Sequence, residues 1–510
     1  MINIYNPEIN KYTKSALNAI EDGWISNHGK YIELANNKLK EITQSKYSIL
    51  MSNGTCATHC LFLSLKYKYP NLNKIYIPNN CYVAAWNAGL MVYNINQLEV
   101  MNMDMNTWNI STDEKYIKSL EENSAILIVH NLGNIINVPR LKRIRPDLIF
   151  VEDNCEGMFG KYDNIYSGMS DSSLCSSCSF YGNKIITTGE GGAFFTQDEE
   201  VYNYIKSVYS QGMSETKYLH NLHAYNYRMT NIQAGFLYDQ LIDLENILKN
   251  KNNIFKNYDL FLQNLVELNK VQLIKNEENT INAPWIYALR IINNNKNIEE
   301  TTLFFKNNNI DIRPFFYPIN SHKHLKYIKN DDEVSYSLNK DIIMIPSSPS
   351  ITEEEQKQVI DSIYNFILYQ NNIKIIEITN ENRNDIYNNF LSKINNLNFR
   401  YFNKRNINCL NNHIISVILY DYIKNIYIGY SHIDYENEHW IGIYILDEYQ
   451  NNKLGTFLLN YVLQHKKVYK INEINLTVDI NNISAIKLYE KNNFKIIDKK
   501  DTYYKMTKLK

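Results

Sequence analysis

The sequence predicts an α/β domain built on a mostly parallel sheet, followed by a smaller α+β domain. In residues 1 to about 368, short apolar runs such as KYSILMSN, SAILIVHNLGN and DLIFVEDN alternate with helix-period segments, a pattern typical of a parallel sheet with helices between its strands. A polar break, YQNNIK at residues 369–374, ends this alternation. We therefore expect one domain over residues 1–368 and a second over residues 374–510.

The predicted elements follow in chain order. Helix-period residues run from Ala57 to Lys68 and from Arg140 to Arg145, each between apolar runs. A long helix is expected from Asn226 to Lys251, and a closing helix near the ITEEE segment at Ile351, where a cap and an acidic first turn favour a helix start. In the second domain, strands are expected at HIISVILYDY, NIYIGYSHI, HWIGIYIL and INEINLTVDI, and helices from Thr456 and at Ser484.

The composition excludes several classes of function. The 510 residues carry a net charge of −1, so no nucleic-acid or membrane-surface partner is expected. The first residues, MINIYNPEINKY, lack a basic stretch followed by an apolar one, and no apolar run approaches the thickness of a bilayer. Seven scattered cysteines are typical of reduced thiols, and the Cys175–Cys178 pair has no second pair with which to share a metal. We therefore expect a cytoplasmic protein in which these two cysteines pack near a turn and bind no metal.

One lysine, Lys184, lies in an unusual setting. It follows the run CSFYGN and precedes TTGEGG and a strand-like stretch, so its surroundings are expected to be buried or half-buried. Burying an ammonium without a partner is costly, whereas a desolvated lysine with a lowered pKa is the usual nucleophile for a carbonyl group. The setting therefore indicates a lysine that holds a carbonyl cofactor, with pyridoxal phosphate as the candidate.

Pyridoxal phosphate needs three further groups, and the sequence offers candidates for each. Asp153, at the end of the run DLIFVED, can pair with the ring nitrogen. Gly54, Thr55 and Cys56 stand between a strand and a helix, where backbone N–H groups and hydroxyls bind phosphate. Tyr82 follows another strand and can lie against the ring. Each also has a structural reading, as a helix cap, a turn or a core residue, but the combination favours the cofactor site.

These motifs resemble a known family. Lys184 in SFYGNK, together with TTGEGG, VEDNCEG, SNGT and NYRMTNIQAG, resembles the DegT/DnrJ/EryC1/StrS family of sugar aminotransferases over residues 1–368. The resemblance implies a pyridoxal-phosphate enzyme of fold type I, with a small C-terminal α/β subdomain. YNYRMTNIQAG and IDIRPFFYPI are most similar to the perosamine-synthase branch, which aminates C4 of a nucleotide-linked 4-keto-6-deoxysugar.

The resemblance implies roles for the residues around the lysine. Lys184 would bind the cofactor covalently and move the substrate proton, Asp153 would pair with the ring nitrogen, and Tyr82 would stack on the ring. Glu156 stands where the family often has Gln or His near the cofactor. Dehydratase relatives carry His at the position of Lys184, so the lysine favours transamination, with L-glutamate as the amino donor.

The resemblance also implies a site shared between subunits. Thr55 and Ser179 would bind the phosphate, joined by the partner subunit's Asn226, because the family's sites lie between two protomers. A homodimer is therefore expected. The segment WISNHG, from Trp24 to Gly29, and Arg313 correspond to family segments near the sugar nucleotide.

The second domain carries a candidate anion site. The segment QNNKLGT, from Gln450 to Thr456, connects a strand to an apolar helix, and such loops present free N–H groups suited to a pyrophosphate. Together with LTVDINNISAIKLYEKNNFKI, it resembles the GNAT N-acetyltransferases over about residues 374–508. The family's loop reads Arg/Gln-x-x-Gly-x-Gly/Ala. Gln450 and Gly455 match this pattern, Lys453 replaces the first glycine, and Thr456 follows Gly455.

The GNAT resemblance implies acetyl-CoA as a cosubstrate. The loop would bind its pyrophosphate, Asn482 would lie near the CoA arm, and Tyr489 would be the acid that returns a proton to the CoA thiolate. His439 and Glu438, beside the central strand, are the candidates for a general base. Taken alone, LYEKNNF reads as part of an amphipathic helix packed on a core.

The two domains together predict a bifunctional nucleotide-sugar enzyme. It would transfer the amino group of L-glutamate to C4 of a 4-keto-6-deoxyhexose and then acetylate the new amine with acetyl-CoA. Analogy with viosamine and bacillosamine pathways alone suggests UDP as the nucleotide, with hydroxyl or acetamido at C2. One alternative is a GDP- or dTDP-sugar aminotransferase whose GNAT module, with Lys453 in its loop, is inactive and serves assembly. Another is a regulatory protein that binds pyridoxal phosphate, against which the set of Lys184, Asp153 and Ser179 argues.

Overall fold

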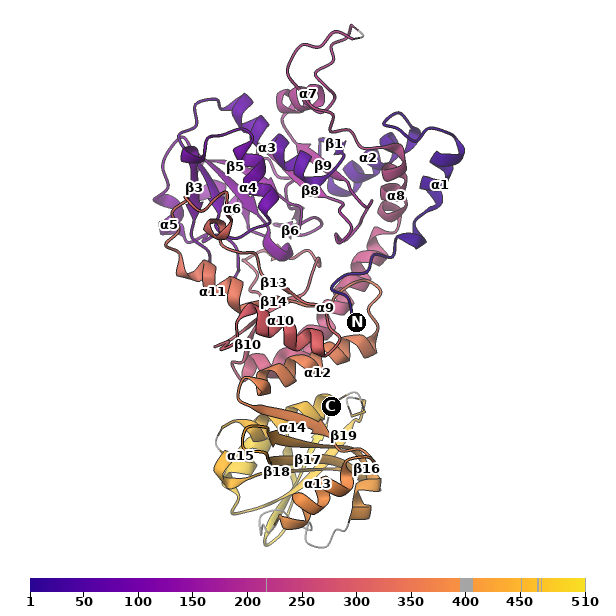
Figure 1. Ribbon diagram of the computed structural model, residues 1–510, viewed down its shortest axis with the longest axis vertical. Helices are drawn as coiled ribbons and strands as arrows, with labels where there is room; N and C mark the ends of the chain where they lie inside the picture. Colours follow the sequence, from indigo (N-terminus) through magenta and orange to yellow (C-terminus); the bar gives the residue numbers. More distant parts are fainter. Residues whose placement is uncertain (217, 395–406, 451, 466, 469, 510) are drawn as a thin grey trace. The chain divides into compact units, whose positions relative to one another are not determined.

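The computed structural model describes residues 1–510 except 217, 395–406, 451, 466, 469 and 510. The chain divides into two compact units (Figure 1), which are described separately below. The first unit comprises Met1–Asp259 and Gln272–Gln356, and the second comprises Leu260–Val271 and Lys357–Lys510. The predicted domain boundary at residues 369–374 falls where one helix ends at Tyr369 and the next strand begins at Ile373; it stays a prediction. Among the described residues, no helix has the length and apolar character needed to cross a bilayer.

A seven-stranded sheet forms the centre of the first unit, with the strand order β1-β9-β8-β5-β4-β2-β3. Strands β8, β5, β4, β2 and β3 run parallel, whereas β9 runs antiparallel to its neighbours β1 and β8. The predicted mostly parallel sheet is therefore confirmed. The strands are β1 (Tyr47–Met51), β2 (Ile75–Pro78), β3 (Leu98–Met101), β4 (Ala125–Val129), β5 (Ile149–Asp153), β8 (Cys175–Ser179) and β9 (Gly192–Thr196).

Both faces of this sheet are covered. In β4, Ile126 and Ile128 belong to one hydrophobic cluster and Leu127 to another, because successive side chains of a strand point to opposite faces. Cys175 and Cys178 of β8 are divided between the same two clusters, so the two cysteines pack separately instead of facing one another. The helices of this unit are α1 (Lys14–Glu21), α2 (Lys30–Thr43), α3 (Gly54–Lys68), α4 (Val83–Leu90), α5 (Glu114–Lys118), α6 (Val138–Ile144), α7 (Glu199–Val208), α8 (Asn231–Ile242), α10 (Ile298–Asn307) and α11 (Glu333–Asp341).

The helix predicted from Asn226 to Lys251 is two helices in the structure. The first, α8, begins at Asn231 because Thr230 forms a capping box with Gln233, in which each side chain bonds the backbone N–H of the other. Asp243 has non-helical backbone angles and separates α8 from α9 (Leu244–Glu267). Helix α9 and helix α12 (Glu353–Tyr369) contribute residues to both units.

Two smaller sheets are formed by short strands between Lys161 and Met344. One has the order β10-β12-β14-β13 and the other the order β11-β6-β7. Their strands are β6 (Lys161–Tyr162), β7 (Ile165–Tyr166), β10 (Val271–Gln272), β11 (Thr280–Ile281), β12 (Ala288–Ile291), β13 (Arg313–Pro314) and β14 (Ile342–Met344).

The second unit is built on another seven-stranded sheet, with the order β15-β16-β17-β18-β19-β21-β20. Its neighbouring strands pair antiparallel except β18 and β19, which pair in parallel; among the described residues, Trp440 and Asn475 are the one pair that joins these two strands. The elements are β15 (Ile373–Glu377), α13 (Arg383–Asn389), β16 (His413–Asp421), β17 (Ile426–Glu436), β18 (Glu438–Ile445), α14 (Leu454–Gln464), β19 (Glu473–Asp479), α15 (Ile483–Lys491), β20 (Lys495–Lys499) and β21 (Tyr503–Leu509).

Helices α13 and α14 lie on opposite faces of this sheet. Phe390, directly after α13, packs in one cluster with Tyr430 of β17 and Tyr444 of β18. A Cβ atom on Gly455 of α14 would lie 3.9 Å from Ile445 of β18. Because Tyr444 and Ile445 are successive residues of one strand, their side chains point to opposite faces.

Candidate active sites

The carboxyl ends of β5 and β8 bring two of the predicted residues to one edge of the main sheet. Asp153 is the last residue of β5 and Ser179 the last of β8, and these strands are parallel neighbours. Both residues are buried. Asp153 accepts hydrogen bonds from the Cys155 N–H at 3.1 Å and from the Thr58 hydroxyl at 3.4 Å. A carboxylate is thus held at the edge of the sheet where ligands bind in folds of this kind.

Lys184 lies on the loop that follows β8 and is half-buried. Its N–H donates to the Tyr181 carbonyl at 2.9 Å, and its own carbonyl accepts from the Tyr5 hydroxyl at 2.6 Å. The Nζ atom lies 3.9 Å from the centroid of the Trp285 ring, and the Trp285 Nε1–H donates to the Asn183 carbonyl at 2.8 Å. Trp285 therefore holds both the amine, through a cation–π contact, and the loop that carries it.

Trp285 was not predicted as part of the site, and a second lysine holds it in place. Lys251 of α9 is completely buried, and its Nζ donates to the carbonyl of Trp285 at 2.8 Å and to the carbonyl of Ser347. Burial lowers the pKa of Lys251 to about 7. A neutral amine carries two N–H donors, which these two carbonyls satisfy.

Glu156 shares a small pocket with Lys184, Ser179 and Trp285. Its carboxylate is buried and accepts the Leu132 N–H at 2.8 Å. Burial raises the pKa of Glu156 to about 7, and the positive charge of Lys184 offsets part of the rise. The pocket thus brings the lysine, one predicted phosphate ligand and a carboxyl group that titrates near neutral pH together.

The first turn of α3 lies against Ser179. A Cβ atom on Gly54 would lie 2.7 Å from the Ser179 Cβ and 2.9 Å from its Oγ, so glycine is needed for this approach. Thr55 follows with an exposed side chain, whereas the Cys56 N–H is already bonded to the Asn53 side chain at 2.9 Å. Two hydroxyls beside the start of a 15-residue helix suit a phosphate group. The residues present therefore fit pyridoxal phosphate.

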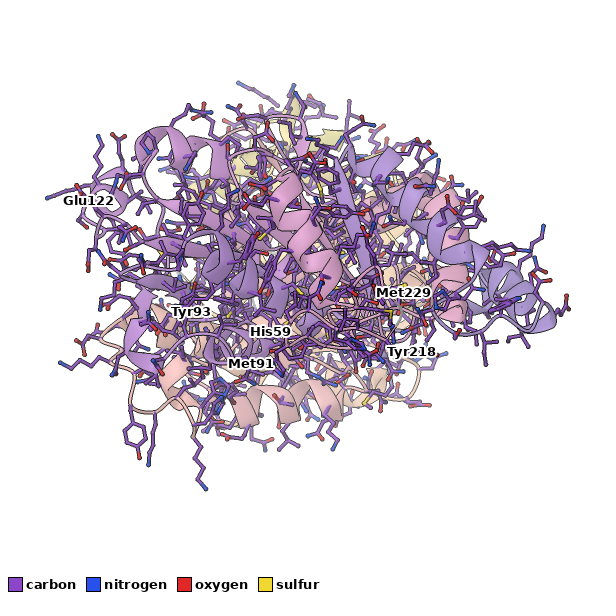
Figure 2. All side chains as sticks on the ribbon, turned by 90° about the horizontal axis from the view of Figure 1, so that it is seen from above. His59, Met91, Tyr93, Glu122, Tyr218 and Met229 are labelled. Carbon is purple, nitrogen blue, oxygen red and sulfur yellow. The ribbon has the colours of Figure 1, made fainter. Side chains whose placement is uncertain are left out.

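The segment that leads into α8 packs against α3. The Ser52 N–H donates to the Tyr227 carbonyl at 2.8 Å, and His59 Nδ1, labelled in Figure 2, lies 3.0 Å from the Tyr227 hydroxyl. Burial lowers the pKa of His59 to about 4. Asn226 is exposed, accepts a hydrogen bond from the Arg228 Nε–H at 3.0 Å and forms an antiparallel bridge with Ser210, in the segment between α7 and α8. Its role in a partner's site stays a prediction.

The remaining residues predicted for this site have exposed side chains. The Tyr82 ring, at the start of α4, is 62% exposed and meets Phe316 edge-on with the centroids 6.4 Å apart. Trp24 is 61% exposed, and Arg313 is exposed and paired with Asp311. It stays a prediction that Tyr82 stacks on a cofactor ring. It also stays a prediction that Trp24 and Arg313 contact a sugar nucleotide.

In the second unit, the predicted anion site is the start of α14. Lys453 is the N-cap residue and has a φ of 61°, in the left-handed region that glycine adopts without strain. A Cβ atom on Gly455 would meet Leu488 at 3.6 Å, an ordinary contact. Thr456 is half-buried in the first turn, where helix N–H groups lack partners within the helix. The helix start thus has the form of an anion site, with a strained lysine where glycine is expected.

The loop before α14 is folded back onto the end of β18. The Gln450 Nε2 donates to Asp447 Oδ1 at 2.7 Å and to the Ile445 carbonyl at 3.2 Å. Asn451 lies outside the described residues. Gln450 therefore shapes the loop, and its contact with a pyrophosphate stays a prediction.

Asn482 is the N-cap residue of α15, and Tyr489 lies within this helix. The Asn482 side chain caps the helix by accepting the Ala485 N–H at 3.1 Å. Tyr489 is buried and meets the Phe494 ring edge-on, with the centroids 5.7 Å apart. Burial raises the pKa of Tyr489 to about 12, so its hydroxyl carries a proton at neutral pH. These contacts give both residues a structural role, and their roles toward CoA stay predictions.

The two candidates for a general base occupy the start of β18. The Glu438 carboxylate forms an ion pair with Lys505 at 2.9 Å. The His439 ring lies tilted against the Tyr435 ring, with the centroids 5.0 Å apart. Both side chains thus contact neighbouring residues, and the role of either one as a general base stays a prediction.

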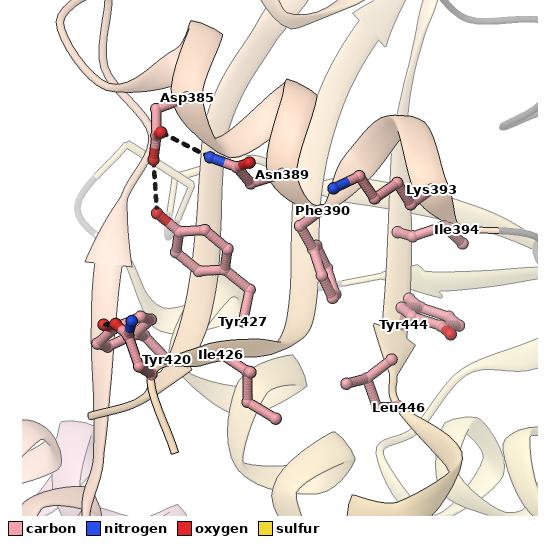
Figure 3. Close-up of a pocket in the computed structure, with 11 residues that line it drawn as sticks. Asp385, Asn389, Phe390, Lys393, Ile394, Tyr420, Ile426, Tyr427, Tyr444 and Leu446 are labelled. Carbon is pink, nitrogen blue, oxygen red and sulfur yellow. Dashed lines mark hydrogen bonds between the residues drawn. The ribbon is translucent and has the colours of Figure 1, made fainter. Parts of the chain in front are cut away.

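A pocket of about 630 Å³ opens between α13 and the sheet of the second unit (Figure 3). Tyr427 and Tyr444 line it from the strands and Phe390 from the helix side. Asp385 accepts hydrogen bonds from the Tyr427 hydroxyl at 3.0 Å and from the Asn389 amide at 2.7 Å. Aromatic walls with a few fixed polar groups are typical of ligand pockets.

Residues 7–364 match the DegT/DnrJ/EryC1/StrS aminotransferase family. The chain belongs to this family. Residues 384–494 match the acetyltransferase (GNAT) family, so a GNAT domain follows the DegT-type aminotransferase domain. The lysine pocket described above lies within the DegT-type match, and the start of α14 lies within the GNAT match.

Curated relatives cover the DegT-type part of the chain. A GDP-perosamine synthase of Escherichia coli O157:H7 is 28% identical over 369 residues, which are 72% of this chain and 98% of that protein. A GDP-perosamine synthase of Vibrio cholerae is 28% identical over 380 residues, 72% of this chain and 99% of that protein. This DegT-type chain is therefore a sugar aminotransferase homologue that carries an additional domain.

Solved structures agree with the fold of the DegT-type domain. A DegT DnrJ EryC1 StrS aminotransferase from Brucella abortus has a TM-score of 0.61 and 22% identity, covering 70% of this chain and 95% of that one. The sugar aminotransferase CalS13 from Micromonospora echinospora also has a TM-score of 0.61, at 17% identity, covering 71% of this chain and 99% of that one. Fold type I is thus confirmed, and dependence on pyridoxal phosphate follows from the DegT-type family.

Proposed function

We propose that this protein transfers the amino group of L-glutamate to C4 of a nucleotide-linked 4-keto-6-deoxyhexose and then acetylates the new amine with acetyl-CoA. The observation that carries the first step is the pocket that Lys184, Ser179 and Glu156 line together. Asp153 ends the neighbouring strand at the same edge of the sheet. The observation that supports the second step is the GNAT domain, whose substrates are primary amines such as the one that the first step makes.

The residues of the first site divide the work of transamination. When bound, pyridoxal phosphate supplies a carbonyl that exchanges amines and a ring that withdraws electrons. In our proposal Lys184 Nζ moves the proton at the reacting carbon, first from glutamate and later to C4 of the sugar. The Asp153 carboxylate keeps a proton on the ring nitrogen, and Ser179 and Thr55 bind the phosphate at the start of α3. Trp285, packed over Nζ, keeps water from the amine.

Two nucleotides are candidates for the substrate. Our expectation from the analogy with N-acetylated 4-amino sugars is UDP. The names of the curated relatives, GDP-perosamine synthase and GDP-4-keto-6-deoxy-D-mannose 3-dehydratase, favour GDP as a second candidate. Lys184 supports amination in either case, because the dehydratase branch has His at this position.

Acetyl-CoA is the proposed cosubstrate of the second site. The first turn of α14 would bind the pyrophosphate through Gly455 and Thr456, with Gln450 shaping the loop. Asn482 would lie near the CoA arm, and the Tyr489 hydroxyl, which is protonated at neutral pH, would supply the proton to the leaving thiolate. A covalent link between the two domains raises the effective concentration of the amino sugar for the second site.

The proposed assembly is a homodimer with shared cofactor sites. The exposed Asn226, in the segment between α7 and α8, would contact the phosphate bound by the other subunit. Light scattering on the full-length protein should give at least twice the mass of one chain. A fully active monomer would contradict the shared site.

One experiment tests both steps. The purified protein is incubated with L-glutamate and acetyl-CoA and with 4-keto-6-deoxyhexoses linked to UDP, GDP or dTDP. We expect 2-oxoglutarate and free CoA thiol to form in equal amounts with one of these sugars, and Lys184→Ala to form neither. Glutamate consumption without thiol release would support an aminotransferase with an inactive GNAT module. No reaction with any sugar, despite bound pyridoxal phosphate, would support the regulatory alternative.

A further inference from the structure

Two histidines and an aspartate form a buried cluster on β16 and β17 that nothing above assigns a role. The side chains of His413, His432 and Asp434 are at most 5% exposed. Asp434 Oδ2 lies 3.6 Å from His432 Nε2 and 4.0 Å from His413 Nε2. The two imidazole rings stack with their centroids 4.4 Å apart and their planes at 13°. This group is called the His–Asp cluster below.

The stacking of the rings argues against a shared metal ion. A metal bound by two imidazoles lies near both ring planes, where the nitrogen lone pairs converge. Rings that stack at 13° have lone pairs in nearly parallel planes. By contrast, a carboxylate oxygen 3.6 Å from His432 Nε2 is placed to attract, and so to orient, an imidazole that takes up a proton.

The register of the sheet places the His–Asp cluster beside the stretch where β18 and β19 are not paired, which is called the gap below. His432 is directly opposite Gly442 of β18, and Asp434 is directly opposite Trp440. Trp440 is also the residue of β18 that pairs with Asn475, and no later residue of β18 pairs with β19 in the described part of the chain. Directly opposed residues of antiparallel strands point to the same face. No side chain on Gly442 therefore stands between the His432 ring and the gap.

The His–Asp cluster faces away from the start of α14. Tyr430, two residues before His432, shares its face and packs with Tyr444 in the cluster around α13. Gly455 of α14 lies near Ile445, which points to the other face. The thioester of acetyl-CoA, entering the gap from the α14 face, would therefore meet the amine of the sugar entering from the face that carries His432.

We propose that the His432 imidazole is the general base of acetyl transfer, oriented by Asp434 and stacked on His413. This inference rests on the proposed acetylation. The amine nitrogen of the sugar forms a bond to the thioester carbonyl carbon, and the carbon–sulfur bond breaks. The proton of the amine goes to His432, and the sulfur takes the proton of the Tyr489 hydroxyl. The imidazolium then returns its proton through solvent to the phenolate, so that the enzyme regains its starting state.

The test uses the full-length protein, acetyl-CoA, and the 4-amino sugar nucleotide that the protein's own first reaction produces. Thiol release measures acetyl transfer, and 2-oxoglutarate formation measures transamination in the same sample. We expect His432→Gln to lower the rate of acetyl transfer by about 100-fold or more, with acetyl-CoA binding and transamination within about twofold of wild type. His465→Gln replaces a buried histidine of the same unit outside the cluster and should leave all three unchanged.

A second variant separates catalysis from folding. His432→Ala should lose acetyl transfer, and added imidazole should restore part of it, because the small molecule replaces the missing ring. If His432→Ala loses acetyl-CoA binding as well as acetyl transfer, and imidazole restores neither, the cluster has a structural role and the proposal is wrong. A wild-type rate of acetyl transfer in His432→Gln would also overturn the proposal. The same holds if a chelator abolishes acetyl transfer by the wild-type protein and zinc restores it.

Two further outcomes are distinguishable. If Glu438→Gln or His439→Gln stops acetyl transfer while His432→Gln does not, the base lies at the start of β18 and the proposal is wrong. If the wild-type protein releases no thiol with any amino sugar, the proposed acetylation itself fails, and the proposal fails with it.

Discussion

Gly54 offers a sharp test of the phosphate side of the lysine pocket. The Gly54→Ala variant would place a Cβ atom 2.7 Å from the Ser179 Cβ, whereas carbon atoms in favourable contact lie about 3.5–4.0 Å apart. The start of α3 must therefore move by about 1 Å, and overpacking of this kind costs about 1–3 kcal/mol. If the same energy is lost from the phosphate contacts, cofactor affinity falls by about 5- to 150-fold.

The assay combines titration of the cofactor-free protein with pyridoxal phosphate and a thermal melt. The matched control is Gly182→Ala, because Gly182 lies on the lysine loop and a Cβ atom there would meet nothing within 4 Å. Adding Ser179→Gly to Gly54→Ala should restore the melting temperature but not the affinity, since the hydroxyl is then missing. If Gly54→Ala binds the cofactor as tightly as Gly182→Ala and melts at the same temperature, the reasoning about this helix start is wrong.

Four further predictions concern single side chains. Lys184→Ala should bind no cofactor covalently, so borohydride reduction should label the wild type alone, and equal labelling would refute the assignment. Asp153→Asn should keep the cofactor but slow single-turnover conversion of glutamate by on the order of 100-fold; a wild-type rate would remove Asp153 from the mechanism. Lys453→Gly should relieve the left-handed strain and raise the unfolding free energy of the second unit by about 1 kcal/mol in urea, whereas destabilisation would show that the lysine makes a compensating contact. The pKa of His59 is about 4 in the folded protein and about 6.5 in the unfolded chain. Between these values the folded state binds fewer protons than the unfolded state, so the protein loses stability as the pH falls through this window. His59→Phe should flatten the dependence of the unfolding free energy on pH in this window, and an unchanged slope would refute the role of His59.

The parts of the first site that could be predicted from the sequence are those encoded by short segments. Asp153 ends an apolar run, and Gly54 stands between a strand and a helix, so the sequence alone placed both at the edge of a parallel sheet. Lys184 stood out because of its immediate neighbours. Trp285 did not, because its contact with the lysine depends on how a distant part of the chain folds back through Lys251.

Two other features had no local signal. The break between α8 and α9 depends on the backbone conformation of Asp243, whose side chain accepts a hydrogen bond from the distant Tyr12 at 2.8 Å. The His–Asp cluster depends on the register between β16, β17 and β18. In the sequence, His432 and Asp434 read as alternate residues of a strand, and nothing near them indicates that His413 completes the group.

The register of β17 also limits how this domain can change in evolution. Because side chains alternate along a strand, the loss or gain of one residue between Tyr430 and His432 would turn His432 and Asp434 to the α14 face. Such a change would bury two polar groups against that helix and remove them from their present face in a single event. Residues 422–425, between β16 and β17, lie outside both strands. Length changes are therefore expected in that turn, and substitutions rather than insertions within β17.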